Sequence, residues 1–242
     1  MHQTLLLALA LLAAPAIADE ARVRQAVEAK LGGMKVDGVQ PTPVAGIFEV
    51  RFQTPDGPRI VYSDSQGNYF FTGNLIEAKS DRDLTQERLQ KLTSIEFDSL
   101  PLELAVKIQR GSGRRVLAMF SDPYCPYCRK LEQALLQIDD LTVYVFMYPV
   151  IRPDYADHSR AVWCSKDRAK SWLELAAYES VKVPAAGAKC ANPVDKVLEL
   201  GRALRVNSTP TLYFANGERA GGGLPVAQLR AKLDEVAKQT RK

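Results

Sequence analysis

Two of the four cysteines in this 242-residue chain have the spacing of a reactive pair. Cys125 and Cys128 are separated only by Pro126 and Tyr127, and cysteines at this spacing can open and close a disulfide without rearranging a fold. The thiolate is the attacking species in thiol–disulfide exchange. The spacing therefore predicts a redox-active dithiol.

The segments on either side of the dithiol indicate how it is held. Residues 116–120 are apolar and predict a buried strand, and residues 129–136 have the spacing of a helix. Cys125 then lies at a helix N-terminus, where unpaired N–H groups and the helix dipole favour a thiolate. Pro126 suits the first helical turn, which does not use its missing N–H. Cys125 is the predicted nucleophile, and Cys128, one turn deeper, is the predicted resolving cysteine.

The other two cysteines are expected to form a structural disulfide. Four cysteines allow three pairings, and a bridge within the dithiol leaves Cys164 to pair with Cys190. Such a loop of about 25 residues would contribute roughly 3–4 kcal/mol to stability. Cys164 follows Trp163 on an apolar helix, which favours a buried bridge. Binding of zinc by all four sulfurs is the alternative, but the spacing lacks a second pair and His158, predicted on a helix surface, belongs to no ligand cluster, so no metal is expected.

The N-terminus has the pattern of an export signal. An apolar run from Leu5 to Ile17 ends in a small-x-small cleavage pattern at Ala18. The run is shorter than the roughly 20 residues that span a bilayer. Residues 1–18 are therefore a predicted signal peptide, with an uncleaved anchor or a buried helix as the alternatives, and the mature protein is expected in an oxidising compartment.

Composition indicates an ordinary globular protein. Apolar residues make up 46% of the chain, which allows a proper core, and the formal net charge is only +4. Basic and acidic residues are interspersed, without the basic block that would follow a phosphate backbone. Nucleic acid is therefore not expected as a partner.

The first part of the mature chain predicts a small β-rich domain. A helix is expected at residues 21–31, ending at Gly32 and Gly33, followed by short strands between Val44 and Ile76. A connecting helix is expected at residues 84–92. Small sheets of this kind often associate through their edge strands, so dimerisation is expected.

The second part has the alternating pattern of an α/β sheet. Strands are expected at residues 104–108, 116–120, 141–147 and 211–214, and helices after the dithiol and at residues 155–178, 193–204 and 225–238. The helix at 155–178 is expected to break near Lys166 and Asp167. This order predicts a thioredoxin-like domain with a helical insertion.

Pro210 supports that assignment. It stands just before a predicted strand, where proline is ordinarily unfavourable. In thioredoxin-like domains a cis-proline at this point faces the cysteine pair, and the backbone of the preceding residue, here Thr209, pairs with an extended substrate. We expect a cis bond, with a trans bond at the start of a strand as the alternative.

Taken together, these features resemble the DsbC/DsbG family of periplasmic thiol:disulfide interchange proteins. The most specific motifs are residues 120–131, 162–167 and 201–211. The resemblance implies an α+β protein in which a small β-rich (cystatin-like) dimerisation domain at residues 19–80 and a linker helix at 81–100 precede the catalytic domain. That thioredoxin-like domain would cover residues 101–242, with its helical insertion at about 154–192.

The family also implies how the protein works. It implies a V-shaped homodimer with an apolar cleft, misfolded or mis-oxidised exported proteins as substrates, a DsbD-type membrane reductant and no cofactor beyond the cysteines. Thr209 and Pro210 would hold the substrate strand, and Tyr124 and Tyr127 would shape its approach.

Two features of the chain point to different branches of the family. The dipeptide Pro126–Tyr127 is similar to the DsbG branch, whereas the extra pair Cys164 and Cys190 resembles DsbC. We favour a disulfide isomerase of the DsbC type with chaperone activity. A DsbG-type reductase that protects single sulfenylated cysteines and a non-enzymatic periplasmic holdase are the alternatives.

Overall fold

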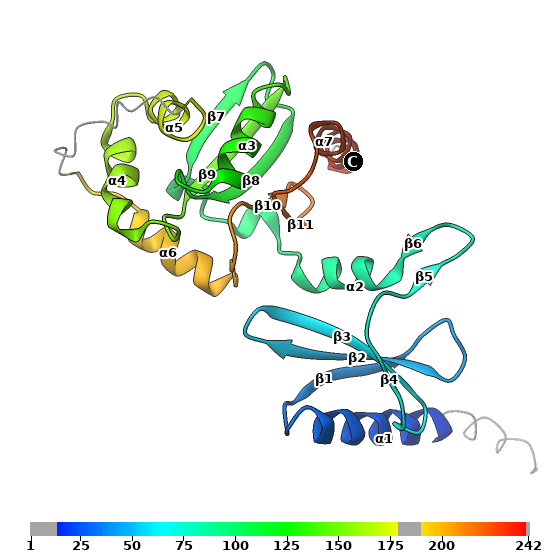
Figure 1. Cartoon of the computed structure of the whole chain (residues 1–242). Coiled ribbons are helices and arrows are strands. Elements are labelled where there is room, and N and C mark those ends of the chain that lie inside the picture. Colours follow the sequence, from blue (N-terminus) through cyan, green and yellow to red (C-terminus); the bar gives the residue numbers. More distant parts are fainter. Residues whose placement is uncertain (1–13, 179–189, 241–242) are drawn as a thin grey trace, which may run out of the picture. The chain divides into compact units, whose positions relative to one another are not determined.

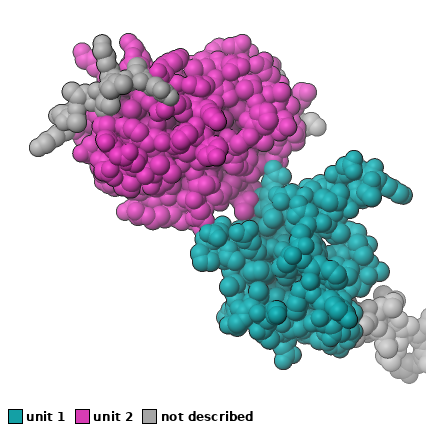
Figure 2. All heavy atoms as spheres, viewed as in Figure 1, with its two compact units in different colours: residues 1–92 teal, residues 93–242 magenta. Residues whose placement is uncertain are grey.

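The computed structural model describes residues 14–178 and 190–240 (Figure 1). The chain forms two compact units, Met1–Leu92 and Thr93–Lys242, shown in different colours in Figure 2. Each unit has its own hydrophobic core, so each is described by itself.

The first helix, α1, spans Ala14–Lys30 and begins earlier than the expected residue 21. The predicted signal segment, residues 1–18, lies for the most part outside the described residues. The helix ends as predicted, because Gly32 and Gly33 take positive φ angles and the Gly33 N–H donates to the Glu28 carbonyl at 2.8 Å. This is the glycine-terminated end that lets the chain leave a helix without steric strain.

The first unit is built on an antiparallel sheet. Its strands, in spatial order, are β1 (Val36–Pro41), β2 (Ile47–Thr54), β3 (Gly57–Asp64) and β4 (Phe70–Phe71). A separate short hairpin joins β5 (Ile76–Glu77) to β6 (Arg82–Asp83). Val23 and Val27 of α1 pack against Phe48 and Val50 of β2 and form a small core.

Strand β1 is not among the predicted strands. Gly38 and Pro41 lie within it, and both residues normally argue against a strand. The pairing with β2 is irregular between Val36 and Gly38, and the space that a side chain at Gly38 would need is filled by the Arg51 guanidinium. A glycine is therefore needed at position 38, because the Arg51 side chain occupies the space of a Cβ beside this irregular pairing. No local sequence pattern predicts such a contact.

Helix α2 (Leu84–Thr93) corresponds to the predicted linker helix. Its Arg88 side chain donates to Glu49 at 3.2 Å and to Gln40 at 3.0 Å, both on the first sheet. Thr85 shares a hydrogen bond with the Tyr62 hydroxyl. These contacts make the helix part of the first unit, which extends to Leu92 rather than to residue 80.

The second unit contains a mixed five-stranded sheet. The strands are β7 (Val106–Arg110), β8 (Arg115–Ser121), β9 (Leu141–Met147), β10 (Thr211–Phe214) and β11 (Arg219–Gly221). Their spatial order is β11-β10-β8-β9-β7, with β8 and β9 parallel and the other neighbours antiparallel. The bounds of β9 and β10 are those predicted from their apolar runs.

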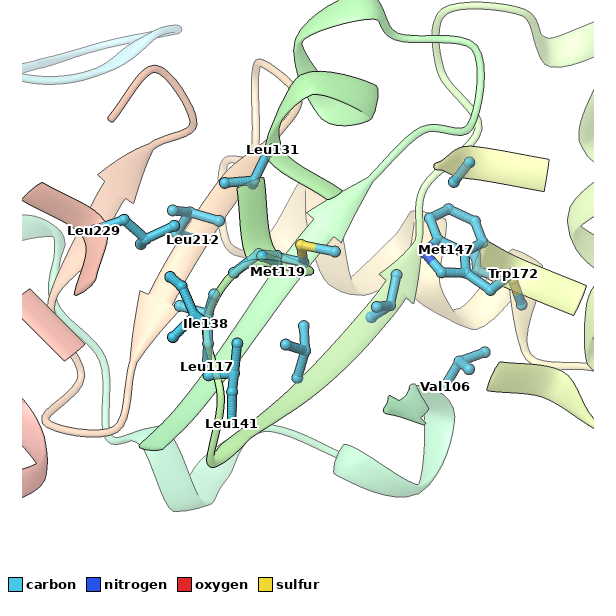
Figure 3. Packing of buried hydrophobic residues seen from close by; sticks show 14 of the residues in the cluster. Val106, Leu117, Met119, Leu131, Ile138, Leu141, Met147, Trp172, Leu212 and Leu229 are labelled. Carbon is cyan, nitrogen blue, oxygen red and sulfur yellow. The ribbon is translucent and has the colours of Figure 1, made fainter. Parts of the chain in front are cut away.

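Helices cover both faces of this sheet. They are α3 (Pro126–Leu135), α4 (Ala156–Cys164), α5 (Arg168–Ala176), α6 (Val194–Ala203) and α7 (Val226–Gln239), with short 3-10 turns at Phe97–Ser99, Leu102–Leu104 and Pro153–Tyr155. Leu117 and Met119 of β8 face the layer of α3, α5 and α7 (Figure 3). Ala118 and Phe120 face the opposite layer, because side chains alternate along a strand. The predicted thioredoxin-like architecture is confirmed.

The predicted helical insertion consists of α4 and α5. The break between them falls at the expected place, and the Asp167 carboxylate caps α5 by accepting the Lys170 N–H at 3.0 Å. Residues 179–189 of the predicted insertion lie outside the described residues.

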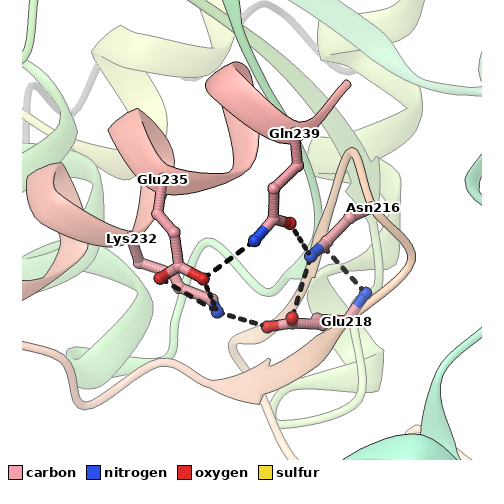
Figure 4. Close-up of polar contacts among 5 residues, drawn as sticks. All are labelled: Asn216, Glu218, Lys232, Glu235 and Gln239. Atoms are coloured by element: carbon pink, nitrogen blue, oxygen red, sulfur yellow. Dashed lines mark hydrogen bonds and ion pairs between the residues drawn. The ribbon is translucent and has the colours of Figure 1, made fainter. Parts of the chain in front are cut away.

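A polar network joins α7 to the turn between β10 and β11 (Figure 4). Lys232 pairs with Glu218 at 2.6 Å, and Gln239 accepts a hydrogen bond from Asn216 at 3.1 Å. Glu235 in turn accepts from Gln239 at 3.0 Å. The network holds the hairpin that begins immediately after Pro210.

A buried carboxyl group lies between α3 and α5. Glu132 is 2% exposed, and its Oε1 accepts a hydrogen bond from the Trp172 indole N–H at 2.7 Å. Burial raises the pKa of this carboxyl to about 7, against the opposing effects of the Trp172 bond and the Arg110 charge. As the pH rises, the Glu132 carboxyl therefore loses its proton later in the folded protein than in the unfolded chain.

We predict that Glu132→Gln removes a pH dependence of stability. A carboxyl whose folded pKa is raised stabilises the fold fully below its unfolded pKa, and this contribution is lost as the pH rises through about 7. The free energy of unfolding of the wild type should fall by roughly 2–4 kcal/mol relative to the variant between pH 5 and pH 8. Urea unfolding at both pH values measures the difference, with Glu103→Gln at an exposed position as control. An equal difference at the two pH values would contradict the assignment.

Candidate active site

The cysteine pair lies at the junction of β8 and α3. Cys125 is the N-cap residue of α3 and has extended backbone angles, and Pro126 occupies the first helical turn. The Cys125 N–H donates to the Asp122 carbonyl at 3.1 Å, and the Arg129 N–H donates to the Cys125 carbonyl at 3.1 Å. The predicted strand-to-helix setting of the pair is confirmed.

Both cysteines carry thiols, and both are buried. Cys125 is 4% exposed and Cys128 is 1% exposed, so the expected greater exposure of Cys125 is present but small. The Cys125 Sγ donates to the Thr209 carbonyl oxygen at 3.3 Å. The Thr209–Pro210 peptide bond is cis, as predicted. The fold therefore brings the predicted substrate dock into contact with the first cysteine.

The environment of Cys128 keeps its sulfur protonated. Burial raises the pKa of the Cys128 thiol to about 12, and the nearby Cys125 acts in the same direction. The Ser121 and Thr209 hydroxyls and the Asp122 N–H, which lies 3.4 Å from the sulfur, lower the pKa but do not outweigh burial. Cys128 is therefore a thiol near neutral pH.

Ser121 and Asp122 are site residues that the sequence analysis did not identify. Both are fully buried; Ser121 is the last residue of β8 and Asp122 follows it. Their only signal in the sequence is that two polar residues end an otherwise apolar run. That signal is compatible with a turn at the surface, so it does not by itself indicate contact with a sulfur.

The two predicted tyrosines have different environments. Tyr127 is 66% exposed and is available to a ligand. Tyr124 is half-buried, and its hydroxyl, whose pKa burial raises, is bonded to Nδ1 of His158. Its ring also packs against Tyr155 with centroids 5.1 Å apart. His158 lies on helix α4, as expected, where its half-buried side chain contacts the residue next to Cys125.

The second cysteine pair forms a disulfide between Cys164 and Cys190, as predicted. Its Cα atoms are 5.8 Å apart, within the usual range for such bridges. The expected burial is wrong, because Cys164 is only half-buried and Cys190 is exposed. The bridge ties the end of α4 to the segment that leads into α6.

Across residues 14–178 and 190–240, His, Cys, Asp and Glu side chains form no group that could hold a metal ion. Over the same residues, none of the helices combines the length and apolar character needed to cross a bilayer.

Family models match both units of the chain. The model of a thioredoxin-like domain matches residues 102–237. The model of the disulfide bond isomerase protein N-terminal domain matches residues 14–86.

Known relatives cover most of the chain. It is 40% identical over 211 residues to a probable thiol:disulfide interchange protein DsbC of Bordetella pertussis, covering 87% of this chain and 73% of the relative. It is 29% identical over 229 residues to the thiol:disulfide interchange protein DsbC of Escherichia coli strain K12, covering 92% and 91% of the two chains.

A solved structure supports the same assignment. The crystal structure of a disulfide interchange protein from Neisseria gonorrhoeae is 38% identical, with a TM-score of 0.53 over 57% of this chain and 99% of that one. The chain therefore belongs to the DsbC family of thiol:disulfide interchange proteins, and its activity is that of a thiol–disulfide oxidoreductase and isomerase.

Proposed function

We propose that the protein reduces and rearranges incorrect disulfides in exported proteins, with Cys125 as nucleophile and Cys128 as resolving cysteine. One observation carries the proposal. The Cys125 thiol lies at the N-terminus of α3 against the Thr209 carbonyl, with the more deeply buried Cys128 thiol one helical turn further on.

The chemistry follows from thiol–disulfide exchange. The Cys125 thiolate attacks one sulfur of a substrate disulfide, a mixed disulfide forms, and the other substrate sulfur leaves as a thiolate. In isomerisation, a different substrate thiolate attacks the substrate sulfur of the mixed disulfide, forms the rearranged bond and expels the Cys125 thiolate. No net electrons are consumed.

Reduction uses the second cysteine. The Cys128 thiolate attacks the Cys125 sulfur and expels the reduced substrate, which leaves a Cys125–Cys128 disulfide. Two electrons must then come from a separate reductant, for which we propose a DsbD-type membrane partner. The raised pKa of Cys128 makes this branch slow, because only the thiolate attacks. A long-lived mixed disulfide gives substrate thiols time to rearrange.

The substrate dock is the Thr209–Pro210 segment, with Tyr127 and Tyr124 beside it. In the dithiol form the Thr209 carbonyl accepts a hydrogen bond from the Cys125 thiol. When the sulfur is instead bonded to a substrate, that carbonyl becomes available to accept a backbone N–H of the substrate strand. Formation of the mixed disulfide and strand binding therefore support each other.

We predict that Cys125→Ser abolishes repair of a scrambled ribonuclease, with a loss of at least 100-fold in rate. Cys128→Ser is the matched control, since it keeps the nucleophile and should accumulate the mixed disulfide on non-reducing gels. Full isomerase activity in Cys125→Ser would show that the proposed nucleophile is wrong.

Two observations bear on the branch of the family. The Cys164–Cys190 disulfide, together with relatives named DsbC, supports the isomerase. The Pro126–Tyr127 dipeptide keeps reduction of single sulfenylated cysteines as a second candidate. A side-by-side assay with scrambled ribonuclease and a sulfenylated protein distinguishes them. A holdase would still suppress the aggregation of other proteins after Cys125 and Cys128 have both been replaced.

Gly222 supports the dock from behind. Its N–H donates to the Pro210 carbonyl at 3.0 Å, and a Cβ at this position would overlap the Pro210 ring. The neighbouring Gly223 has open space at the same point. Of these two positions, only 222 requires glycine, because the Pro210 ring leaves no room there for a side chain.

We predict that Gly222→Ala lowers kcat/KM for isomerisation about 10-fold, because the added methyl group displaces Pro210 from its place beside Cys125. Gly223→Ala should stay within twofold of the wild type, which makes it the matched control. Thermal unfolding of both variants checks that they fold. Equal activities of the two folded variants would exclude the supporting role.

We further propose that the protein is a homodimer joined through its N-terminal unit. The matched N-terminal family domain supports this. Strand β4 lies at an edge of the sheet, and Tyr69, Phe71 and Ile76 nearby are 68%, 48% and 48% exposed. An exposed apolar edge is a ready surface for pairing with a second copy.

Sedimentation of the full mature chain should therefore give the mass of a dimer, and Tyr69→Ser with Phe71→Ser should weaken the dimer at least 10-fold. Tyr178→Ser, at an exposed aromatic in the other unit, is the control and should leave it intact. A monomeric wild type would refute the dimer.

We also propose that residues 1–18 direct export and are removed, so that the protein works in the periplasm. The apolar run at the N-terminus and the periplasmic role implied by the family support this.

A further inference from the structure

Two buried hydroxyl groups near the cysteine pair have no hydrogen bond in the dithiol form. They belong to Ser121, which is 0% exposed, and to Thr209, and neither has a hydrogen-bond partner within residues 14–178 and 190–240. A buried hydroxyl without a partner costs free energy, and native proteins contain few of them. Two such groups at one active site therefore need a physical reason.

Strand β8 places Ser121 on the side of the sheet that carries Cys128. Side chains alternate along a strand, so Ser121 faces the same layer as Leu117 and Met119, which is the layer that contains α3. Cys128 is buried in the first turn of α3. The Ser121 hydroxyl therefore approaches the Cys128 sulfur from the sheet.

Three donors from two separate segments surround this sulfur. The Ser121 and Thr209 hydroxyls both lower the pKa of the Cys128 thiol, because they can donate to the sulfur once it is ionised. The Asp122 N–H lies 3.4 Å from the same sulfur. Ser121 ends β8 and Thr209 precedes β10, so the donors converge because these two strands are neighbours in the sheet.

Two of the three donors are held in place before any charge forms. Oδ2 of Asp122 accepts the Val150 N–H at 2.7 Å, and Oδ1 accepts the Tyr124 N–H at 2.8 Å. Asp122 is itself 0% exposed. The segment that carries the Ser121 hydroxyl and the Asp122 N–H is therefore fixed, and little reorganisation is needed when the sulfur ionises.

This arrangement suits a thiolate better than a thiol. The neutral sulfur of a thiol is a weak acceptor and carries a proton of its own, so it does not use three donors. A thiolate has no proton and accepts charge-assisted hydrogen bonds, which are roughly twice as strong as neutral ones. The two hydroxyls therefore gain a partner when Cys128 ionises.

We propose that Ser121 is a catalytic residue for reduction, because its hydroxyl donates to the Cys128 thiolate as this sulfur attacks the mixed disulfide. The inference rests on the proposed function. The Cys128 thiol first loses its proton to solvent. Its thiolate then bonds to the Cys125 sulfur, the bond from Cys125 to the substrate breaks, and the substrate sulfur leaves with the electron pair.

The Ser121 hydroxyl then determines how the mixed disulfide is divided between two outcomes. Reduction requires the Cys128 thiolate, which burial makes rare and the Ser121 hydroxyl makes less rare. Isomerisation requires only a substrate thiolate and does not use Cys128. Ser121 therefore speeds reduction without speeding isomerisation.

The first test uses Ser121→Ala in the full mature chain with dithiobis(nitrobenzoic acid), a disulfide whose thiolate is coloured. Attack by Cys125 releases one coloured thiolate at a rate that depends on reagent concentration. Attack by Cys128 on the Cys125 sulfur releases the second at a rate that does not. We expect the second phase to slow at least 10-fold and the first to change less than twofold, because hydrogen bonds to charged groups are the stronger ones.

Ser159→Ala is the matched control. Ser159 on α4 is also 0% exposed, and its hydroxyl also lacks a hydrogen-bond partner in the described part of the chain. Both phases should stay within twofold of the wild type. An unchanged second phase in Ser121→Ala would overturn the proposal, and equal slowing of both phases would assign Ser121 a structural role. Release of a single thiolate by the wild type would instead contradict Cys128 as the resolving cysteine, and with it the proposed function.

The second test compares Ser121→Thr with Ser121→Val. The two introduced side chains have nearly the same shape and differ in a hydroxyl against a methyl group, so any strain from the larger side chain is common to both. We expect the second phase to be at least 10-fold faster with threonine, and the mixed disulfide with scrambled ribonuclease to accumulate only with valine. Equal second-phase rates in the two variants would exclude a role for the hydroxyl.

Discussion

The burial of Cys128 beneath Cys125 is the constraint on which the active site depends. A sulfur in this position is costly to ionise, and the hydroxyl and N–H groups around it only partly offset the effect. Both sulfurs are almost inaccessible to solvent. The raised pKa of Cys128 delays resolution of the mixed disulfide, because only a thiolate attacks.

That burial requires α3 to be packed tightly on the sheet. Leu131 and Leu135 of the helix join the same core as Leu117 and Met119 of β8. Strand β10 pairs with β8 so that Thr211 lies opposite Phe120. The residues just before β10 and just after β8 consequently meet at the same end of these two strands. Thr209 contacts Cys125 there. The core and the site are thus products of the same strand order.

Much of the fold and of the active site could be predicted from patterns in neighbouring residues of the sequence. Strands β9 and β10 consist of apolar, aromatic and β-branched residues, and their bounds follow directly from these runs. The same holds for the cysteine pair, for helix α3 and for Pro210. Each could be predicted from the sequence, because each has a local signature of spacing or position. Strand β1 was not, because its glycine and proline serve pairing and packing with distant residues.

The sequence by itself determined the chemistry, since a cysteine pair at this spacing before a helix has few other uses, and the chain order specified a thioredoxin-like sheet. Tertiary structure alone decided which polar residues surround the sulfurs. Asp122 looks like a turn residue and Gly222 like one of three equivalent glycines until the fold places them against Val150 and Pro210. It also decided that the Cys164–Cys190 bridge lies at the surface. Burial and contact between distant segments depend on how the whole chain packs, and no local pattern encodes them.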